Sequence, residues 1–376
     1  MPNRFILILI TCILCACSDK PEPSSVLKLS PSGNPLLGLP PLAIPENNPQ
    51  TPEKTALGKQ LFQDKRFSAD DSVNCARCHV PANAFIDSLP VAAGIKDQFG
   101  TRNSPSVINA AFYTHQFWDG RRDTLEEQAK DPFVNVIEHG LSDHRKIVDI
   151  VRTDPDYIKQ FRQVFGLEPA QISIDQVVMA IASFERTLIA GDSPFDQYRF
   201  GGDSHALSDA AIRGLAVFQG KGRCTSCHKI AETSALFTDN QFHNLGVGFG
   251  KITGKLPGLI KAATQAEGNI DAAVLTNAEL SELGRYAVTG NRADLGRFKT
   301  PTLRNIVLTA PYMHDGSLAN LAEVIEFHNQ GGFANPFLDT EIRPLGLTQQ
   351  EKLDLAAFME ALTSSQFADA NYFKQR

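Results

Sequence analysis

The 376-residue chain has no excess of basic residues and only one long apolar run. Its formal net charge is −6, whereas nucleic-acid binding usually requires a basic patch, so the composition argues against a nucleic-acid partner. The apolar run, residues 5–14, is too short to span a bilayer, and no other run approaches that length. Strand patterns are scarce and helical periodicity dominates, which predicts an all-α fold.

The N-terminus has the pattern of an export signal. Arg4 precedes the apolar run, and small residues precede Cys17 as at a bacterial lipoprotein cleavage site. We therefore expect residues 1–17 to be a signal peptide with a lipobox, and a lipid on Cys17 to be the only attachment to a membrane. A plain secretory signal is the alternative. The proline-rich composition of residues 18–50 predicts an extended tether.

Cysteine is scarce: there are seven in the chain, and three of them lie in the leader. The other four form two motifs of one type, Cys75-x-x-Cys78-His79 and Cys224-x-x-Cys227-His228. C-x-x-C-H is the attachment pattern of haem c, in which the thiols bond the vinyl groups and the histidine binds the iron. Cysteine pairs also bind zinc, but export and the histidine after both pairs favour haem. We expect two covalently bound haem c groups.

The surroundings of the two motifs are similar, which indicates an internal duplication. The matching segments are 57–62 and 213–218 before the motifs, and 85–87 and 237–239 after them. We expect two cytochrome c-like domains, residues 51–200 and 201–376, with the haems flanking the domain interface. Residues 192–203 are the expected connection, and residues 246–277 are a glycine- and alanine-rich insertion of undefined structure.

Four helix starts are predicted from capping residues followed by Glu or Gln three positions later: Thr124, Ser173, Asn320 and Thr348. After two of these caps, apolar residues recur at helical spacing. The faces expected to be buried consist of Val177, Val178, Ile181, Phe184 and Leu188, and of Leu355, Phe358, Met359 and Leu362.

The C-terminal haem needs a group on its second face. His328 follows apolar residues at helical spacing in the helix that begins at Asn320, so it shares their face. We expect His328 to bind the iron. A core histidine without a ligand role is the alternative interpretation, and Met313 and Tyr312 are the alternative ligands.

Five segments carry a family resemblance: TRNSP (101–105), FWDGR (117–121), LEEQA (125–129), FKTPTLRN (298–305) and LTAPYMHDGS (308–317). With these motifs the chain resembles bacterial diheme cytochrome c peroxidases and their relative MauG, which oxidises residues of another protein. The resemblance covers roughly residues 51–362.

The resemblance implies that peroxide reacts at the N-terminal haem. It identifies Glu138 as the acid that moves the peroxide proton, Gln128 as an amide that hydrogen-bonds peroxide, and Pro132 as part of the pocket. Trp118, the only tryptophan, matches the residue between the two haems. Taken alone, Glu138 and Gln128 would be interpreted as solvated helix residues and Trp118 as a core aromatic.

The resemblance also implies one calcium ion between the haems. Asn103 and the main-chain carbonyls of Thr309 and Pro311 match its ligands, and oxygen ligands suit this hard cation.

Two departures from the family pattern bear on function. Family members that need reductive activation carry a histidine after the first motif that blocks the N-terminal iron, but here none lies between His79 and His115. We therefore expect an open site, as in MauG. His328 replaces a methionine of the usual peroxidases and a tyrosine of MauG, and histidine generally lowers a haem's potential relative to methionine.

We expect a periplasmic enzyme that reduces hydrogen peroxide to water. The electrons would come from a small exported donor, a cytochrome c or a cupredoxin, through the C-terminal haem. The open site and the non-methionine ligand favour a second hypothesis, MauG-like oxidation of a partner protein. A third hypothesis is an electron-transfer cytochrome without catalysis, which requires two ligands on both irons.

Overall fold

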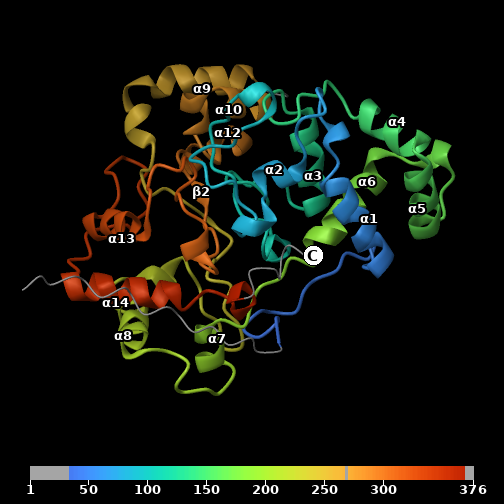
Figure 1. The fold of residues 1–376 in the computed structure, drawn as a ribbon. Helices are drawn as coiled ribbons and strands as arrows, with labels where there is room; N and C mark the ends of the chain where they lie inside the picture. Colours follow the sequence, from blue (N-terminus) through green and yellow to red (C-terminus); the bar gives the residue numbers. More distant parts are fainter. Residues whose placement is uncertain (1–33, 267–269, 369–376) are drawn as a thin grey trace, which may run out of the picture.

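The computed structural model describes residues 34–266 and 270–368 (Figure 1). The predicted signal peptide and lipobox, residues 1–17, lie outside these residues. About 46% of the chain is helical, so a mostly α fold is confirmed. One correction is a two-stranded antiparallel ladder of β1 (Phe242–His243) and β2 (Phe298–Lys299). In the described ranges, no helix combines the length and apolarity that crossing a membrane requires.

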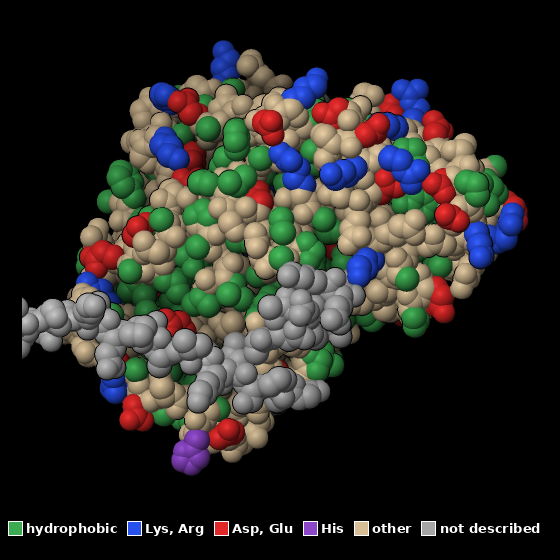
Figure 2. Space-filling model, in the orientation of Figure 1, with side chains coloured by type: hydrophobic (Ala, Val, Ile, Leu, Met, Phe, Trp, Pro, Cys, Tyr) green, Lys and Arg blue, Asp and Glu red, His purple; other side chains and the backbone are tan. Residues whose placement is uncertain are grey.

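The N-terminal half contains α1 (Pro52–Phe62), α2 (Cys75–Cys78), α3 (Leu125–Val134), α4 (Arg145–Thr153), α5 (Pro155–Phe165) and α6 (Ile174–Glu185). The C-terminal half contains α7 (Pro194–Arg199), α8 (Asp209–Gln219), α9 (Leu256–Gln265), α10 (Ile270–Thr276), α11 (Ala278–Ser281), α12 (Tyr286–Thr289), α13 (Leu321–Gln330) and α14 (Gln349–Glu360). On the face in Figure 2, acidic and basic side chains are interspersed.

The four predicted helix starts are confirmed. Thr124, Ser173, Asn320 and Thr348 are the N-caps of α3, α6, α13 and α14, and each side chain accepts a hydrogen bond from a backbone N–H of the first turn. Such a cap stabilises a helix by about 1 kcal/mol. The apolar faces predicted after Ser173 and Thr348 are buried throughout.

The internal duplication has a structural counterpart in two helix crossings. Helix α1 packs across α6, and α8 packs across α14 in the same way. A Cβ on Gly58 would lie 1.8 Å from the Ala180 carbonyl oxygen, and one on Gly214 would lie 1.9 Å from that of Asp354. Both crossings therefore require glycine, because any side chain there would clash with the backbone of the partner helix.

Two hydrophobic cores accompany these crossings. The first extends from Leu57 to Ala190, and the second from Phe195 to Leu362. The cores therefore divide between Ala190 and Phe195, a few residues before the predicted boundary at 200. Helix α7, which carries the fully buried Phe195, occupies part of the expected connection.

The tether prediction is wrong for residues 34–50, because this stretch packs on the folded body. Asn48 is buried, and its amide donates to the Met179 carbonyl at 2.9 Å. The carbonyls of Pro35 and Leu37 accept backbone hydrogen bonds from Gly191 and Asp192. Proline-rich composition predicts an extended backbone, but it does not exclude packing. The rest of the predicted tether, residues 18–33, lies outside the described residues.

The insertion of undefined structure, residues 246–277, is largely helical. It contains α9, α10 and two short 3-10 turns. With the segment that follows it, the insertion forms a third core around Phe249, Ile252 and Leu283, all nearly fully buried. The sequence pattern did not show this core, because its apolar residues are divided among several short elements.

A buried cation, Arg304, joins residues 34–50 to the second core. Arg304 bonds both carboxylate oxygens of Asp196 at 2.7 and 2.8 Å, and neither side chain is more than 1% exposed. The same guanidinium donates to the carbonyls of Gly38 and Ala235, each at 2.7 Å. Among the described residues, this guanidinium therefore bonds one carboxylate and two main-chain carbonyls.

Replacing Arg304 with Met should lower the free energy of unfolding by about 3–5 kcal/mol, because Asp196 would remain buried without its countercharge. The matched control is Arg162→Met, since the Arg162–Glu168 pair is exposed and worth at most about 1 kcal/mol. Urea unfolding of the haem-containing protein, followed by circular dichroism, measures both. Equal losses in the two variants would contradict this account.

Candidate functional site

Each C-x-x-C-H motif lies in the wall of its own cavity. The N-terminal cavity is lined by Cys78 and His79, and the C-terminal cavity by Cys224, Cys227 and His228. Eight residues line both cavities, and we call them the inter-cavity wall: Asn103, Ser104, Pro105, Ser106, Tyr113, Trp118, Lys299 and Pro301.

The motif residues fit covalently bound haem. The Nδ1 of His79 donates to the Phe85 carbonyl at 3.3 Å, and that of His228 donates to the Phe237 carbonyl at 2.8 Å. These bonds fix each ring and leave Nε2 for an iron. Burial lowers the pKa of both imidazoles, which favours the neutral form that binds metal. None of the four motif cysteines forms a disulfide.

The structure brings Gln128, Pro132 and Glu138 together in the N-terminal cavity. Gln128 and Pro132 belong to α3, and Glu138 lies in the turn that follows this helix. Burial in the cavity raises the pKa of Glu138 to about 7, although Arg121 acts in the opposite direction. A carboxyl group with this pKa both accepts and donates protons near neutral pH.

Asn135 holds the Glu138 carboxylate and was missed by the sequence analysis. Its Nδ2 donates to Oε1 of Glu138 at 2.7 Å, and its Oδ1 accepts from the backbone N–H of Ile137 at 2.9 Å. An asparagine at the end of a helix often closes such a turn. That signal could have identified Asn135 as a residue that positions Glu138.

The loop after the first motif packs directly against the turn that carries Glu138. The backbone N–H of Ile95 donates to the carbonyls of Ile137 and Glu138, at 2.9 and 3.1 Å. A Cβ on Gly94 would lie 1.8 Å from the Ile137 carbonyl oxygen, so the close approach requires glycine. Among the described residues that line this cavity, His79 is the only histidine, and none is methionine.

A second carboxyl group in the N-terminal cavity, Glu185, was also missed. It is 5% exposed, burial raises its pKa to about 8, and its Oε2 has no hydrogen-bond partner among the described residues. Glu185 lies at the end of the apolar face of α6, where its sequence neighbours gave no signal of a polar site.

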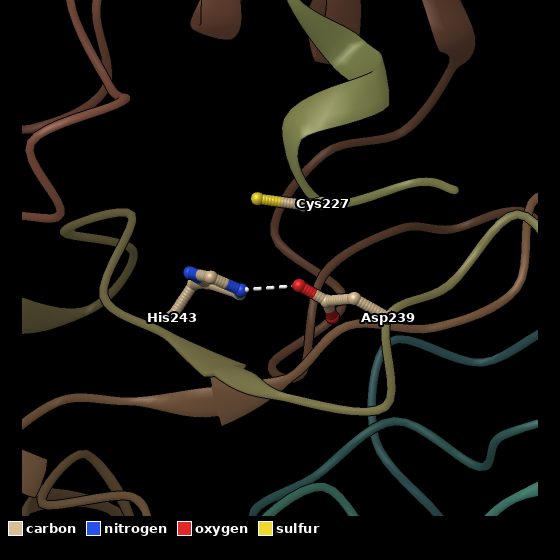
Figure 3. A group of neighbouring side chains, drawn as sticks. All are labelled: Cys227, Asp239 and His243. Atoms are coloured by element: carbon tan, nitrogen blue, oxygen red, sulfur yellow. Dashed lines mark hydrogen bonds and ion pairs between the residues drawn. The ribbon is translucent and has the colours of Figure 1, made fainter. Parts of the chain in front are cut away.

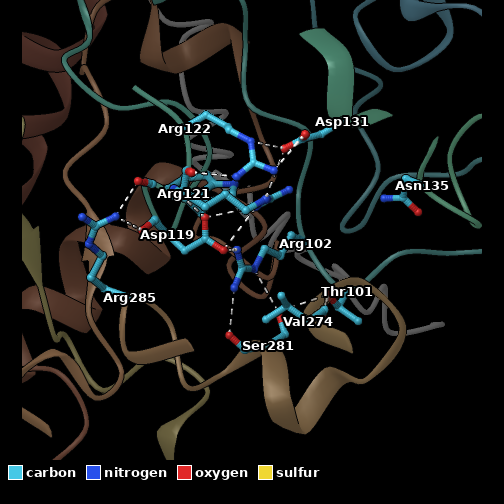
Figure 4. Close-up of polar contacts among 12 residues, drawn as sticks. Thr101, Arg102, Asp119, Arg121, Arg122, Asp131, Asn135, Val274, Ser281 and Arg285 are labelled. Atoms are coloured by element: carbon cyan, nitrogen blue, oxygen red, sulfur yellow. Dashed lines mark hydrogen bonds and ion pairs between the residues drawn. The ribbon is translucent and has the colours of Figure 1, made fainter. Parts of the chain in front are cut away.

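A network of polar contacts connects the insertion, through Val274, and the following helix α11, through Ser281, to the rim of the N-terminal cavity (Figure 4). Asp119 is fully buried between Arg102 and Arg121, which hold its pKa well below the usual range despite burial. Arg102 also donates to the side chain and carbonyl of Ser281 in α11. Leu275 of α10 lines the cavity itself. The C-terminal half therefore helps to close the N-terminal site.

The C-terminal cavity contains several groups that could face His228. The Tyr312 hydroxyl donates to the Ile306 carbonyl at 2.9 Å, and Nε2 of His314 bonds Glu282 at 2.7 Å. By contrast, the ring nitrogens of His328 have no hydrogen-bond partner in the described part of the chain. Burial lowers the pKa of His328 to about 4, so its ring is neutral at neutral pH.

Cys227, Asp239 and His243 lie close enough to suggest a metal site (Figure 3). Cys227 belongs to the haem motif, however, and its sulfur is a thioether once haem is attached. His243 bonds Asp239 at 2.9 Å and Asp339 at 2.6 Å. Hydrogen bonds to Asp239 and Asp339 raise the pKa of His243. Carboxylates engage both ring nitrogens, so neither nitrogen is available to bind a metal.

Trp118 is fixed in the inter-cavity wall. Its indole Nε1 donates to the Asn103 carbonyl at 2.9 Å, and its own carbonyl accepts from the backbone N–H of Lys299 at 2.8 Å. The three residues expected to bind calcium, Asn103, Thr309 and Pro311, all line the C-terminal cavity. Asn103 donates its amide to the Leu89 carbonyl at 2.9 Å, which leaves Oδ1 available as a ligand atom.

Comparison with known proteins agrees with this geometry. The family model for di-haem cytochrome c peroxidase matches residues 52–205. The cytochrome-c peroxidase IdrP1 of Pseudomonas sp. (strain SCT) is 37% identical over 88% of this chain and 86% of its own. The chain belongs to the di-haem cytochrome c peroxidase family. It is therefore an oxidoreductase, and membership implies two haem c groups.

Other relatives of this chain are named MauG or MauG-like rather than peroxidase. The methylamine utilization protein MauG of Methylorubrum extorquens is 37% identical over 85% of this chain and 80% of its own. A solved MauG-like protein associated with microbial copper homeostasis has a TM-score of 0.74 at 31% identity, and covers 89% of this chain and 96% of its own. Peroxidases and MauG proteins are thus both relatives of this enzyme.

Replacing Asn135 with Leu should move the pH dependence of the peroxide reaction. Asn135 donates to the charged form of Glu138, so its loss should raise the Glu138 pKa above about 7. If Glu138 accepts the peroxide proton, as its place in the family pattern implies, the pH at which the rate rises should move upward with this pKa. Rapid mixing at several pH values measures this shift. The control is Asn291→Leu, which removes an exposed N-cap residue and should leave the pH dependence of the rate unchanged. An unchanged pH dependence in Asn135→Leu would refute the role of Asn135 in positioning Glu138.

Proposed function

We propose that this enzyme reduces hydrogen peroxide at the N-terminal haem, with electrons that enter through the C-terminal haem. The overall reaction takes up two electrons and two protons and yields two waters. The observation that carries the proposal is the N-terminal cavity, where Glu138 and Gln128 accompany His79, the one histidine among the described residues that line it. The haem iron on His79 would supply the redox chemistry.

Glu138 would move the proton that this reaction requires. Its carboxylate accepts a proton from the bound peroxide and returns it to the departing oxygen, which leaves as water. Asn135 holds the carboxylate at 2.7 Å while the proton moves. Gln128 would orient the peroxide by hydrogen bonding, and Pro132 would exclude water from one side of the pocket.

The electrons would cross the inter-cavity wall. Trp118 lines both cavities, and its indole and backbone are each held by a hydrogen bond, so we assign it the relay between the haems. We assign His328 as the second ligand of the C-terminal iron, because its ring nitrogens have no hydrogen-bond partner among the described residues, whereas Tyr312 and His314 are engaged. The electron donor would be a small exported cytochrome c or cupredoxin.

A second candidate function is MauG-like oxidation of a partner protein. Two observations favour it: no second histidine lines the described part of the N-terminal cavity, and His328 takes the place of methionine at the other haem. A low-potential C-terminal haem is a poor acceptor of electrons from a high-potential donor, because a low potential favours the oxidised state of the iron over the reduced state.

Two further assignments complete the proposal. We place one calcium ion at Asn103, Thr309 and Pro311, where the free Oδ1 of Asn103 and two carbonyls would supply oxygen ligands. We place the enzyme in the periplasm with a lipid on Cys17, on the basis of its N-terminal sequence alone.

The fully oxidised enzyme should react with stoichiometric peroxide without a reductant. Stopped-flow absorption of the haems should show a rapid change, and Glu138→Gln should slow it about 10²–10⁴-fold through loss of the proton carrier. The control is Glu127→Gln, an exposed carboxyl outside the cavity, which should react at the native rate.

Three results of this experiment would count against the proposal. A native rate in Glu138→Gln would remove the acid from the mechanism. A reaction that begins only after one haem is reduced would show that a ligand closes the N-terminal site. The third result is that small cytochrome c or cupredoxin donors do not sustain peroxide consumption and a partner protein is oxidised instead. This result would favour the MauG-like function.

Replacing His328 with Met should raise the midpoint potential of the C-terminal haem, because methionine favours the reduced iron. Spectroelectrochemical titration of the two haems measures the change, and Met313→Leu is the control, which should leave both potentials unchanged. The assignment of His328 is wrong if Met313→Leu, rather than His328→Met, alters the low-spin spectrum of that haem.

A further inference from the structure

Lys299 is the one charged side chain of the inter-cavity wall. It ends β2, which lies in the middle of the molecule (Figure 1). Its backbone pairs with Phe242 of β1 and donates to the Trp118 carbonyl at 2.8 Å. These bonds fix the residue beside Trp118, and the side chain turns inward, where it is 7% exposed.

The ammonium group of Lys299 has no counterion in the described part of the chain. It forms no ion pair or hydrogen bond there, and its one close partner is the ring of Tyr113, with Nζ 3.3 Å from the ring centroid. A cation over an aromatic ring is only weakly stabilised, and this contact does not offset the cost of burying an unpaired ammonium. Burial accordingly lowers the pKa of Lys299 to about 7.

The neighbouring cations differ from Lys299 in this respect. Arg102 and Arg121 share Asp119, and Arg304 is paired with Asp196. Lys299 therefore stands out as a cation whose anion must come from outside the described protein atoms. Each haem brings two propionate carboxylates, and both haem cavities reach this residue.

We propose that Lys299 binds a haem propionate at the wall between the two cavities and thereby sets the potential of that haem. A fixed positive charge beside a haem stabilises the reduced state, which carries one more negative charge than the oxidised state. Lys299 is thus a positioning residue for electron transfer across the wall. The inference rests on haem at both motifs, but not on whether the oxidised substrate is a small donor or a protein.

The test is a pair of substitutions on the diheme protein, with no peroxide present. Lys299→Met keeps the length of the side chain and removes its charge, and it should lower the midpoint potential of one haem in a spectroelectrochemical titration. Lys299→Arg keeps the charge and should leave that potential close to the native value. Lys146→Met is the control, because it removes a lysine whose partner is the exposed Asp71, and it should shift neither haem.

Mass spectrometry must first show two haems in each variant. Unchanged potentials in a diheme Lys299→Met protein would overturn the proposal, as would equal shifts in the Met and Arg variants. If Lys299→Met does not bind two haems, resonance Raman of the native and Lys299→Arg proteins decides instead. The propionate bending bands should differ, because an ammonium and a guanidinium donate differently, and identical bands would overturn the proposal. Neither readout depends on the peroxide reaction.

Discussion

The hydrogen bond from each motif histidine to a phenylalanine carbonyl fixes the geometry on which the rest of the site depends. His79 and His228 are held through Nδ1, so each presents Nε2 toward its cavity. The two halves of the chain that carry these histidines each contain an equivalent helix crossing, one through Gly58 and one through Gly214. Since both histidines are held in the same way, a difference in chemistry between the two sites would come from the residues on the opposite walls of the cavities.

The two opposite walls differ in the groups they offer. In the C-terminal cavity, His328 lines the same space as His228, and its ring nitrogens have no hydrogen-bond partner in the part of the chain that the structure describes. The N-terminal cavity, which His79 lines, is bordered by Glu138 and Gln128. The loop through Gly94 and Ile95 packs on the turn that carries Glu138. The two cavities therefore differ in the groups that lie opposite the motif histidine, as the roles proposed for the two haems require.

Local sequence signals predicted the parts of this architecture that depend on neighbouring residues. The cap at Ser173 and the buried face after it follow from spacing within one helix. The packing of Asn48 against the backbone of α6, and the approach of Ser281 to Arg102, join residues far apart in the chain. No local pattern encodes such contacts. The unpaired state of Lys299 likewise depends on which acids are absent nearby, and this is visible only after folding.

The electron paramagnetic resonance spectrum of the oxidised, haem-loaded protein tests the central claim most directly, because it reports the coordination of each iron. The open N-terminal site predicts a high-spin ferric signal from that haem, beside a low-spin signal from the C-terminal haem with two histidine ligands. Two low-spin signals of equal intensity would mean that a protein side chain occupies the sixth position of both irons. That result would contradict the account of an open peroxide site.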